Sequence, residues 1–139
     1  MFTSVSARSA SAYKRVGIET SVDHADPHKL VALLFEALQQ ALGAGRLAIQ
    51  NGDIPAKCKH INHAVRILEE GLIAPLNLEQ GGEIAGNLSS LYAYCVNRLT
   101  IANIKNDLAG LEEVSRLIEP IASGWKQING QGPAYLQPV

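Results

Sequence analysis

Four long stretches of the chain repeat apolar residues at three- and four-residue spacing, a pattern typical of helices that bury one face. The first stretch runs from Pro27 to about Gln50, and its main seam contains Leu30, Leu33, Leu34, Ala37, Ala41, Ala44 and Ala48. A second seam, about 100° round the helix axis, contains Val31, Phe35, Leu38, Leu42 and Ile49. The apolar arc of this helix is therefore unusually wide.

Capping and turn residues delimit the first two helices. Asp26 followed by Pro27 predicts an N-cap and a first helical turn, and the run 51–53, Asn-Gly-Asp, predicts the end of that helix. Asp53 with Pro55 begins the second helix, and Pro75 closes it. The seam of the second helix is Ile61, Ala64, Val65, Leu68 and Leu72.

Two more helices follow a Gly-containing loop at residues 78–82. The third helix is predicted over residues 83–105, with inward positions Ile84, Leu88, Leu91, Tyr92, Cys95, Leu99 and Ala102. Asp107 caps the fourth helix, which reaches about residue 128 and which Pro120 is expected to kink or interrupt. Its seam is Leu111, Val114, Ile118, Ile121, Trp125 and Ile128.

Short connections between four helical patterns predict an all-α fold, an antiparallel up-down four-helix bundle with a short N-terminal cap segment. Residues 1–12 are rich in Ser and Ala and are expected to form a disordered arm. Residues 13–22 are interpreted as an extended or irregular segment, so the bundle domain covers residues 13–128. Residues 129–139 contain Gly and Pro and are expected to form a flexible tail.

Composition narrows the classes of partner. Twelve Lys and Arg against thirteen Asp and Glu give a net charge of -1, which disfavours nucleic acid and anionic membranes as partners. Cys58 and Cys95 have no metal-binding or redox spacing, and free thiols fit a reducing cytosol. The first twelve residues lack a secretory core and no run could span a bilayer, so a cytoplasmic location is expected.

Candidate chemistry is sparse. His60 and His63 lie one turn apart, as do His24 and His28, but no carboxylate or thiol completes a metal site at a matching spacing. Cys58 lies between two lysines that could activate a thiol, yet no oxyanion-stabilising device accompanies it. No enzyme and no cofactor is therefore predicted, and a histidine phosphotransfer bundle that uses His60 or His63 stays as the alternative function.

Apolar residues exceed what one seam per helix requires. The first helix has two seams, and the third has Tyr94 and Ile101 seven residues apart on its outward side, with Ile104 one turn beyond. These residues could belong to centrally placed helices, or the N-terminal segment could cover them. They could instead form a groove for a partner helix. The pattern leaves both readings open and predicts a bundle that binds something.

Residues 87–107, NLSSLYAYCVNRLTIANIKND, resemble the most characteristic stretch of the FliS family, in which Leu-Tyr-x-Tyr precedes Arg-Leu, Ala-Asn and Asn-Asp. Three more segments agree in order: Ala12-Tyr13, the run from Asp26 to Glu36, and the run from Leu111 to Lys126. The resemblance covers residues 12–128.

The resemblance implies a cytoplasmic export chaperone that binds the disordered C-terminal segment of flagellin, prevents premature polymerisation and delivers flagellin to the flagellar type III export gate. In the free state the N-terminal segment would cover the groove, or weak self-association would do so. Expected partner-binding residues are Tyr13, Val16, Ile18, Phe35, Leu42, Tyr94, Arg98, Ile101 and Asn103. Tyr94 and Ile101 would anchor the ligand, and Arg98 and Asn103 would offer hydrogen bonds.

Overall fold

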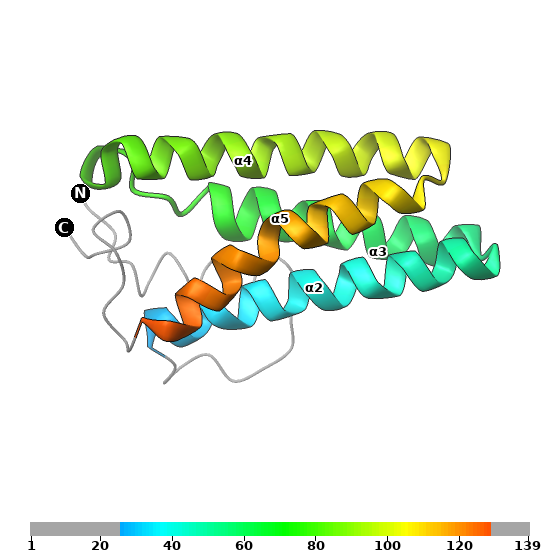
Figure 1. The fold of residues 1–139 in the computed structure, drawn as a ribbon, viewed down its shortest axis with the longest axis horizontal. Coiled ribbons are helices and arrows are strands. Elements are labelled where there is room, and N and C mark those ends of the chain that lie inside the picture. Colours follow the sequence, from blue (N-terminus) through cyan, green and yellow to red (C-terminus); the bar gives the residue numbers. More distant parts are fainter. Residues whose placement is uncertain (1–25, 129–139) are drawn as a thin grey trace.

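The computed structural model describes residues 26–128, which form antiparallel helical rods with no strand among them (Figure 1). In chain order these are α2 (Pro27–Asn51), α3 (Ile54–Arg66) continued directly by the π-helical segment η1 (Ile67–Ile73), α4 (Leu78–Lys105) and α5 (Leu108–Gln127). The predicted all-α bundle is confirmed. The predicted arm 1–12, the segment 13–22 and the tail 129–139 lie outside the described residues.

Local capping chemistry sets the helix ends as the sequence predicts. The Asp26 side chain accepts a hydrogen bond from the Lys29 amide at 2.7 Å, which satisfies one of the free N–H groups at the start of α2. At the end of α2, Gly52 has φ 69°, a left-handed conformation that glycine adopts at little cost. Asp53 and Asp107 cap α3 and α5 by accepting from the amides of Ala56 and Ala109.

One helix limit differs from the prediction, and the interruption that was one of the two expected effects of Pro120 is absent. The expected loop at residues 78–82 is the first turn of α4, because the Asn77 side chain caps it by accepting from the Gln80 amide at 3.0 Å. The break falls at Gly82, whose φ of 52° and ψ of −125° are not helical. α5 passes through Pro120 without interruption, and the buried side chains of Ile118 and Ala122 hold it on both sides of the proline.

The π-helical segment η1 is a feature that the sequence pattern does not reveal. Gly71 lies within it, and a Cβ atom there would come within 3.0 Å of a Leu34 methyl group. The wider turn of a π-helix therefore coincides with the place where η1 approaches α2 most closely. A stretch of seven residues is too short for apolar spacing to separate this geometry from an α-helix.

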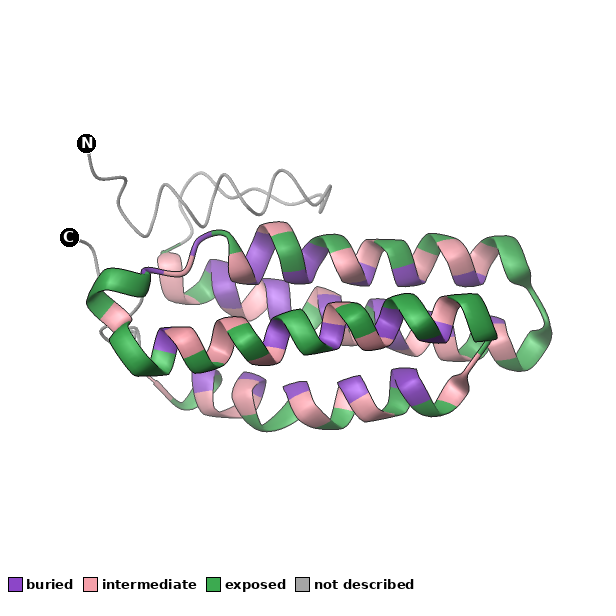
Figure 2. Ribbon diagram, turned by 90° about the horizontal axis from the view of Figure 1, so that it is seen from above, coloured by how far each residue is buried: buried purple, intermediate pink, exposed green. Residues whose placement is uncertain are grey.

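Both apolar seams of α2 lie in the core. Phe35 is 3% exposed and Leu42 is fully buried, together with Leu30 and Leu34 of the main seam. Figure 2 shows the buried residues along the facing sides of the helices. The expectation that Phe35 and Leu42 belong to an exposed surplus is wrong, because α2 packs against α3 and α5 on two sides and these helices cover both seams.

Two hydrogen bonds and a stacked ring pair join the start of α2 to the end of α5. The indole Nε1 of Trp125 donates to the carbonyl oxygen of His28 at 2.8 Å, and His28 Nε2 lies 2.6 Å from the carbonyl oxygen of Trp125. The two rings stack with centroids 5.0 Å apart. His28 thus has a structural role, and His24, which lies one turn before it in the sequence, is outside the described residues.

Candidate partner-binding surface on α4

The apolar residues that the bundle leaves exposed on the outward side of α4 are Tyr94, Ile101 and Ile104, here called the α4 outer face. Their side chains are 45%, 37% and 77% exposed. Tyr94 and Ile101 are seven residues apart, which places them on nearly the same line of the helix about 10 Å apart along its axis. Such spacing matches the anchor positions that an amphipathic partner helix uses.

A polar cluster connects this face to α5. The Tyr94 hydroxyl donates to the Glu113 carboxylate, and Arg98 Nε donates to the other oxygen of Glu113 at 2.8 Å. Arg98 Nη2 also donates to Asp107 Oδ2 at 3.0 Å. Glu113 therefore holds both Tyr94 and Arg98, and the rotamer freedom of the tyrosine is reduced before any partner arrives.

The same contacts shift the ionisation of the cluster in mutually consistent directions. Hydrogen bonds from Tyr94 and Arg98 lower the pKa of the Glu113 carboxyl, and the hydrogen bond from Arg98 lowers the pKa of Asp107. The hydrogen bond to Glu113 raises the pKa of Tyr94 and of Arg98. At neutral pH the cluster consists of one guanidinium between two carboxylates, with a protonated phenol beside them.

Gly110 explains how α5 comes close enough to supply Glu113 and Asp107. A Cβ atom on Gly110 would lie 2.7 Å from Ala102 Cβ and 2.7 Å from Arg98 Nη1. Because real Cβ contacts are longer, only glycine lets the first turn of α5 approach α4 at this distance. Arg98 is consequently engaged within the bundle through Nε and Nη2, and its expected hydrogen bonds to a ligand stay a prediction.

Asn103 lies on the other flank of α4, facing α3. Its carbonyl oxygen accepts from Lys57 Nζ at 2.8 Å, and its side-chain oxygen is 3.7 Å from the Cys58 sulfur. Lys57 is only 4% exposed and also donates to Asn106. The structure therefore brings Tyr94, Arg98 and Ile101 together but separates Asn103 from them, since Asn103 joins α3 to the end of α4.

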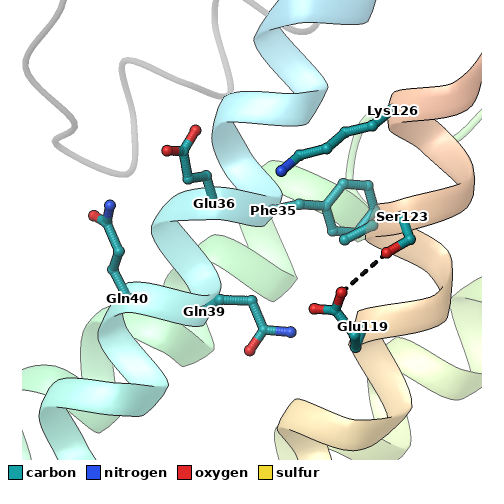
Figure 3. Close-up of a pocket in the computed structure, with 8 residues that line it drawn as sticks. Phe35, Glu36, Gln39, Gln40, Glu119, Ser123 and Lys126 are labelled. Atoms are coloured by element: carbon teal, nitrogen blue, oxygen red, sulfur yellow. Dashed lines mark hydrogen bonds between the residues drawn. The ribbon is translucent and has the colours of Figure 1, made fainter.

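Phe35 reaches the surface only as part of the lining of a pocket between α2 and α5. This open pocket has a volume of about 320 Å³, and Figure 3 shows the Phe35 ring directed toward α5 with Lys126 extending across it. The rest of the lining is mostly polar: Glu36, Gln39, Gln40, Glu119, Ala122, Ser123 and Lys126. The predicted role of Phe35 in partner binding therefore depends on this pocket.

The structure places the histidines and the cysteine that were weighed as metal ligands or nucleophiles as follows. His60 and His63 are half-buried on α3, and no group of three His, Cys, Asp or Glu side chains within residues 26–128 could hold a metal ion. Burial raises the pKa of the Cys95 thiol to about 11, so this thiol is protonated and unreactive at neutral pH. Tyr13, Val16 and Ile18, expected to contact a partner, lie outside the described residues.

Sequence reasoning missed Glu113 and Lys57. Glu113 stands across a tight turn from its partners: Asn106 and Asp107 reverse the chain, so Glu113 on α5 comes back beside Tyr94 and Arg98 on α4. Opposite charges at similar distances before and after a two-residue turn are a signal that could have found this pair. Lys57 carries no comparable signal, because its partners are a backbone carbonyl and an amide on a distant helix.

Comparison with known proteins adds an independent finding. Residues 9–132 match the protein family described as "Flagellar protein FliS". The chain is 45% identical over 118 residues to the flagellar secretion chaperone FliS of Salmonella typhimurium, covering 85% of this chain and 87% of the relative. It is 40% identical over 120 residues to FliS of Vibrio cholerae, covering 86% and 88%. It is 42% identical over 117 residues to FliSB of Pseudomonas aeruginosa, covering 84% and 92%.

Proposed function

Because the chain belongs to the FliS family of flagellar secretion chaperones, we propose that it binds the disordered C-terminal segment of flagellin in the cytoplasm. Binding would prevent premature polymerisation and deliver flagellin to the flagellar type III export apparatus. The observation that carries the proposal is the α4 outer face, where Tyr94, Ile101 and Ile104 stay exposed although the core around them is well filled. A monomer gains nothing in stability from apolar side chains in water.

The geometry of the outer face fits a client that folds as it binds. A disordered segment loses conformational entropy when it becomes helical, and a rigid receptor limits the additional cost. Tyr94 is held by Glu113, and the remaining two members of the face are isoleucines, which have few rotamers. The binding energy would come from burial of Ile101, Ile104 and the exposed part of the Tyr94 ring.

Replacing Ile101 by Asp tests this function. Titration calorimetry with a synthetic flagellin C-terminal peptide should show affinity at least about tenfold weaker than wild type, because a carboxylate would be buried against an apolar anchor. Circular dichroism should show unchanged helicity, since Ile101 is 37% exposed.

The matched control for this test is Leu47→Asp, which introduces the same charge at an exposed apolar residue of α2. It should bind the peptide like wild type. Equal affinity of the Ile101→Asp variant and wild type would refute the role of the outer face, and a loss of helicity in that variant would place Ile101 in the core.

The proposal extends to residues 13–18, Tyr-Lys-Arg-Val-Gly-Ile, as an intramolecular cover of the binding surface that moves aside when flagellin binds. Tyr13, Val16 and Ile18 would compete with the client for apolar contacts. Amide hydrogen exchange in this segment should therefore become faster when the flagellin peptide is added. Unchanged exchange on peptide binding would rule out displacement.

A further inference from the structure

The core-facing stripe of α4 continues past the end of the bundle. Ile84, Leu88, Leu91 and Cys95 follow one another at spacings of four, three and four residues, so they share one face of the helix. Cys95 is fully buried and Leu88 and Leu91 pack against the core, but Ile84 is 59% exposed. Figure 1 shows why: the first turns of α4 extend beyond the end of η1. Ile84 thus lies on the same face of α4 as the core residues, but the prediction that it is buried is wrong.

A second large apolar side chain is exposed at this end. Leu78, the first residue of α4, is 56% exposed. The positive φ of Gly82 separates the turn that contains Leu78 from the regular helix that contains Ile84. We call Leu78, Glu79, Glu83 and Ile84 the α4 amino end. No helix in residues 26–128 covers its two apolar members.

The charged residues in this stretch of the sequence are all acidic. Residues 67–97 contain Glu69, Glu70, Glu79 and Glu83 but no Lys, Arg or His, although the chain has twelve Lys and Arg in all. Within the described part of the chain, Glu70 alone among these carboxylates has an ion pair, with Arg66 at 3.3 Å. Glu79 lies in the first turn, where the helix dipole favours an acid. The dipole does not account for exposed Leu78 and Ile84.

An unpaired polar atom lies beside the same residues. Asn77, which precedes Leu78, is only 7% exposed, and its Nδ2 has no hydrogen-bond partner. A buried amide donor without an acceptor destabilises the fold locally. Nδ2 is itself enclosed by the protein, so a partner docked on the surface does not reach it.

From these observations we propose that the α4 amino end is a second interaction surface, which takes a basic amphipathic segment of a partner protein. Leucine-like side chains of the segment would cover Leu78 and Ile84, while its Lys or Arg side chains would pair with Glu79 and Glu83. Ile84 lies ten residues before Tyr94, about 15 Å along the helix. The two surfaces are therefore separate positions on α4, and the inference does not depend on the proposed function.

The experiment uses the full chain and two synthetic peptides of about 14 residues that place Leu on one helical face. One peptide carries Lys on the other face and its counterpart carries Glu. Calorimetry should show saturable binding of the Leu/Lys peptide and no saturable binding of the Leu/Glu peptide. Ile84→Ser and the double variant Glu79→Gln/Glu83→Gln should each weaken it by about tenfold or more. Leu47→Ser, an equally exposed apolar site on α2, should leave it unchanged.

Equal binding of the two peptides, or wild-type affinity in both the Ile84→Ser and the double variant, overturns the proposal. All variants change exposed residues, and the double variant decides the outcome if Ile84→Ser loses helicity. The Ile84→Ser variant should also bind the flagellin peptide normally, which separates this surface from the α4 outer face.

The chain's own Lys14 and Arg15 are a competing occupant. The full-length variant Lys14→Glu/Arg15→Glu distinguishes a separate partner from this chain's own N-terminal segment. Unchanged affinity for the Leu/Lys peptide supports a separate partner. Affinity about tenfold higher than wild type would mean that this chain's N-terminal segment occupies the α4 amino end, and the proposal would be wrong.

Discussion

Helices α2 and α4 look alike in sequence, because both carry more apolar positions than one buried seam needs, yet the fold treats them differently. α2 packs against α3 and α5 and buries Phe35 and Leu42 almost completely. α4 leaves Tyr94, Ile101 and Ile104 exposed on its outer side. Apolar surplus in a helix therefore does not identify a binding face by itself. The neighbours that the fold supplies decide whether the surplus becomes core or surface.

The largest expected effect tests the α2 side of this comparison. Leu42→Ala should lower the free energy of unfolding by about 2–5 kcal/mol, because it removes three carbon atoms from a fully buried site and leaves a cavity. Urea denaturation measures the change. The same substitution at Leu47, 58% exposed on the same helix, should change stability by no more than about 0.5 kcal/mol.

The stability and binding of these variants should be separable. Leu42→Ala should keep its affinity for the flagellin peptide at temperatures where it is folded, because Leu42 has no exposed surface. If its stability matched wild type while its affinity fell, Leu42 would contact the partner. The distinction between a buried apolar face on α2 and an exposed one on α4 would then be wrong.

A smaller effect concerns how α5 supports the α4 outer face. Glu113 has a lowered pKa in the folded protein, so its contribution to stability is present above the ordinary Glu pKa of about 4.3 and disappears as pH falls through the lowered value. Glu113→Gln should therefore be less stable than wild type at pH 7, with the difference shrinking in acid. Denaturation curves at a series of pH values measure this.

The result would also sharpen the role of Glu113 in recognition. The variant should bind the flagellin peptide somewhat more weakly, since a neutral amide holds Tyr94 and Arg98 less firmly than a carboxylate. A difference in stability that stays constant between neutral and acidic pH would show that the charge of Glu113 is not involved.

The sequence predicts the bundle well, because its signals are local. The caps at Asp26, Asp53 and Asp107 and the left-handed Gly52 are each fixed by a few neighbouring residues, and the structure reproduces them. Burial is less predictable. Ile84 has the spacing of a core residue, but whether another helix lies beneath it depends on how far η1 extends.

The polar contacts of the candidate site depend on tertiary pairing even more strongly. The sequence does not reveal the partners of Arg98 within the fold, because only the close approach of α5 at Gly110 brings two carboxylates to it. Asn103 is four residues from the core residue Leu99, but its side-chain oxygen lies 3.7 Å from Cys58 on α3 and its main-chain carbonyl accepts from the buried Lys57. Such contacts join residues from different helices, and apolar periodicity contains no information about them.

The most direct test of the central claim is a methyl carbon–proton NMR titration of the full chain with a flagellin C-terminal peptide. The account predicts large shifts for the methyl groups of Ile101 and Ile104 on the α4 outer face, and little change for Leu42 in the core. Large shifts at Leu42 with Ile101 and Ile104 unperturbed would contradict it.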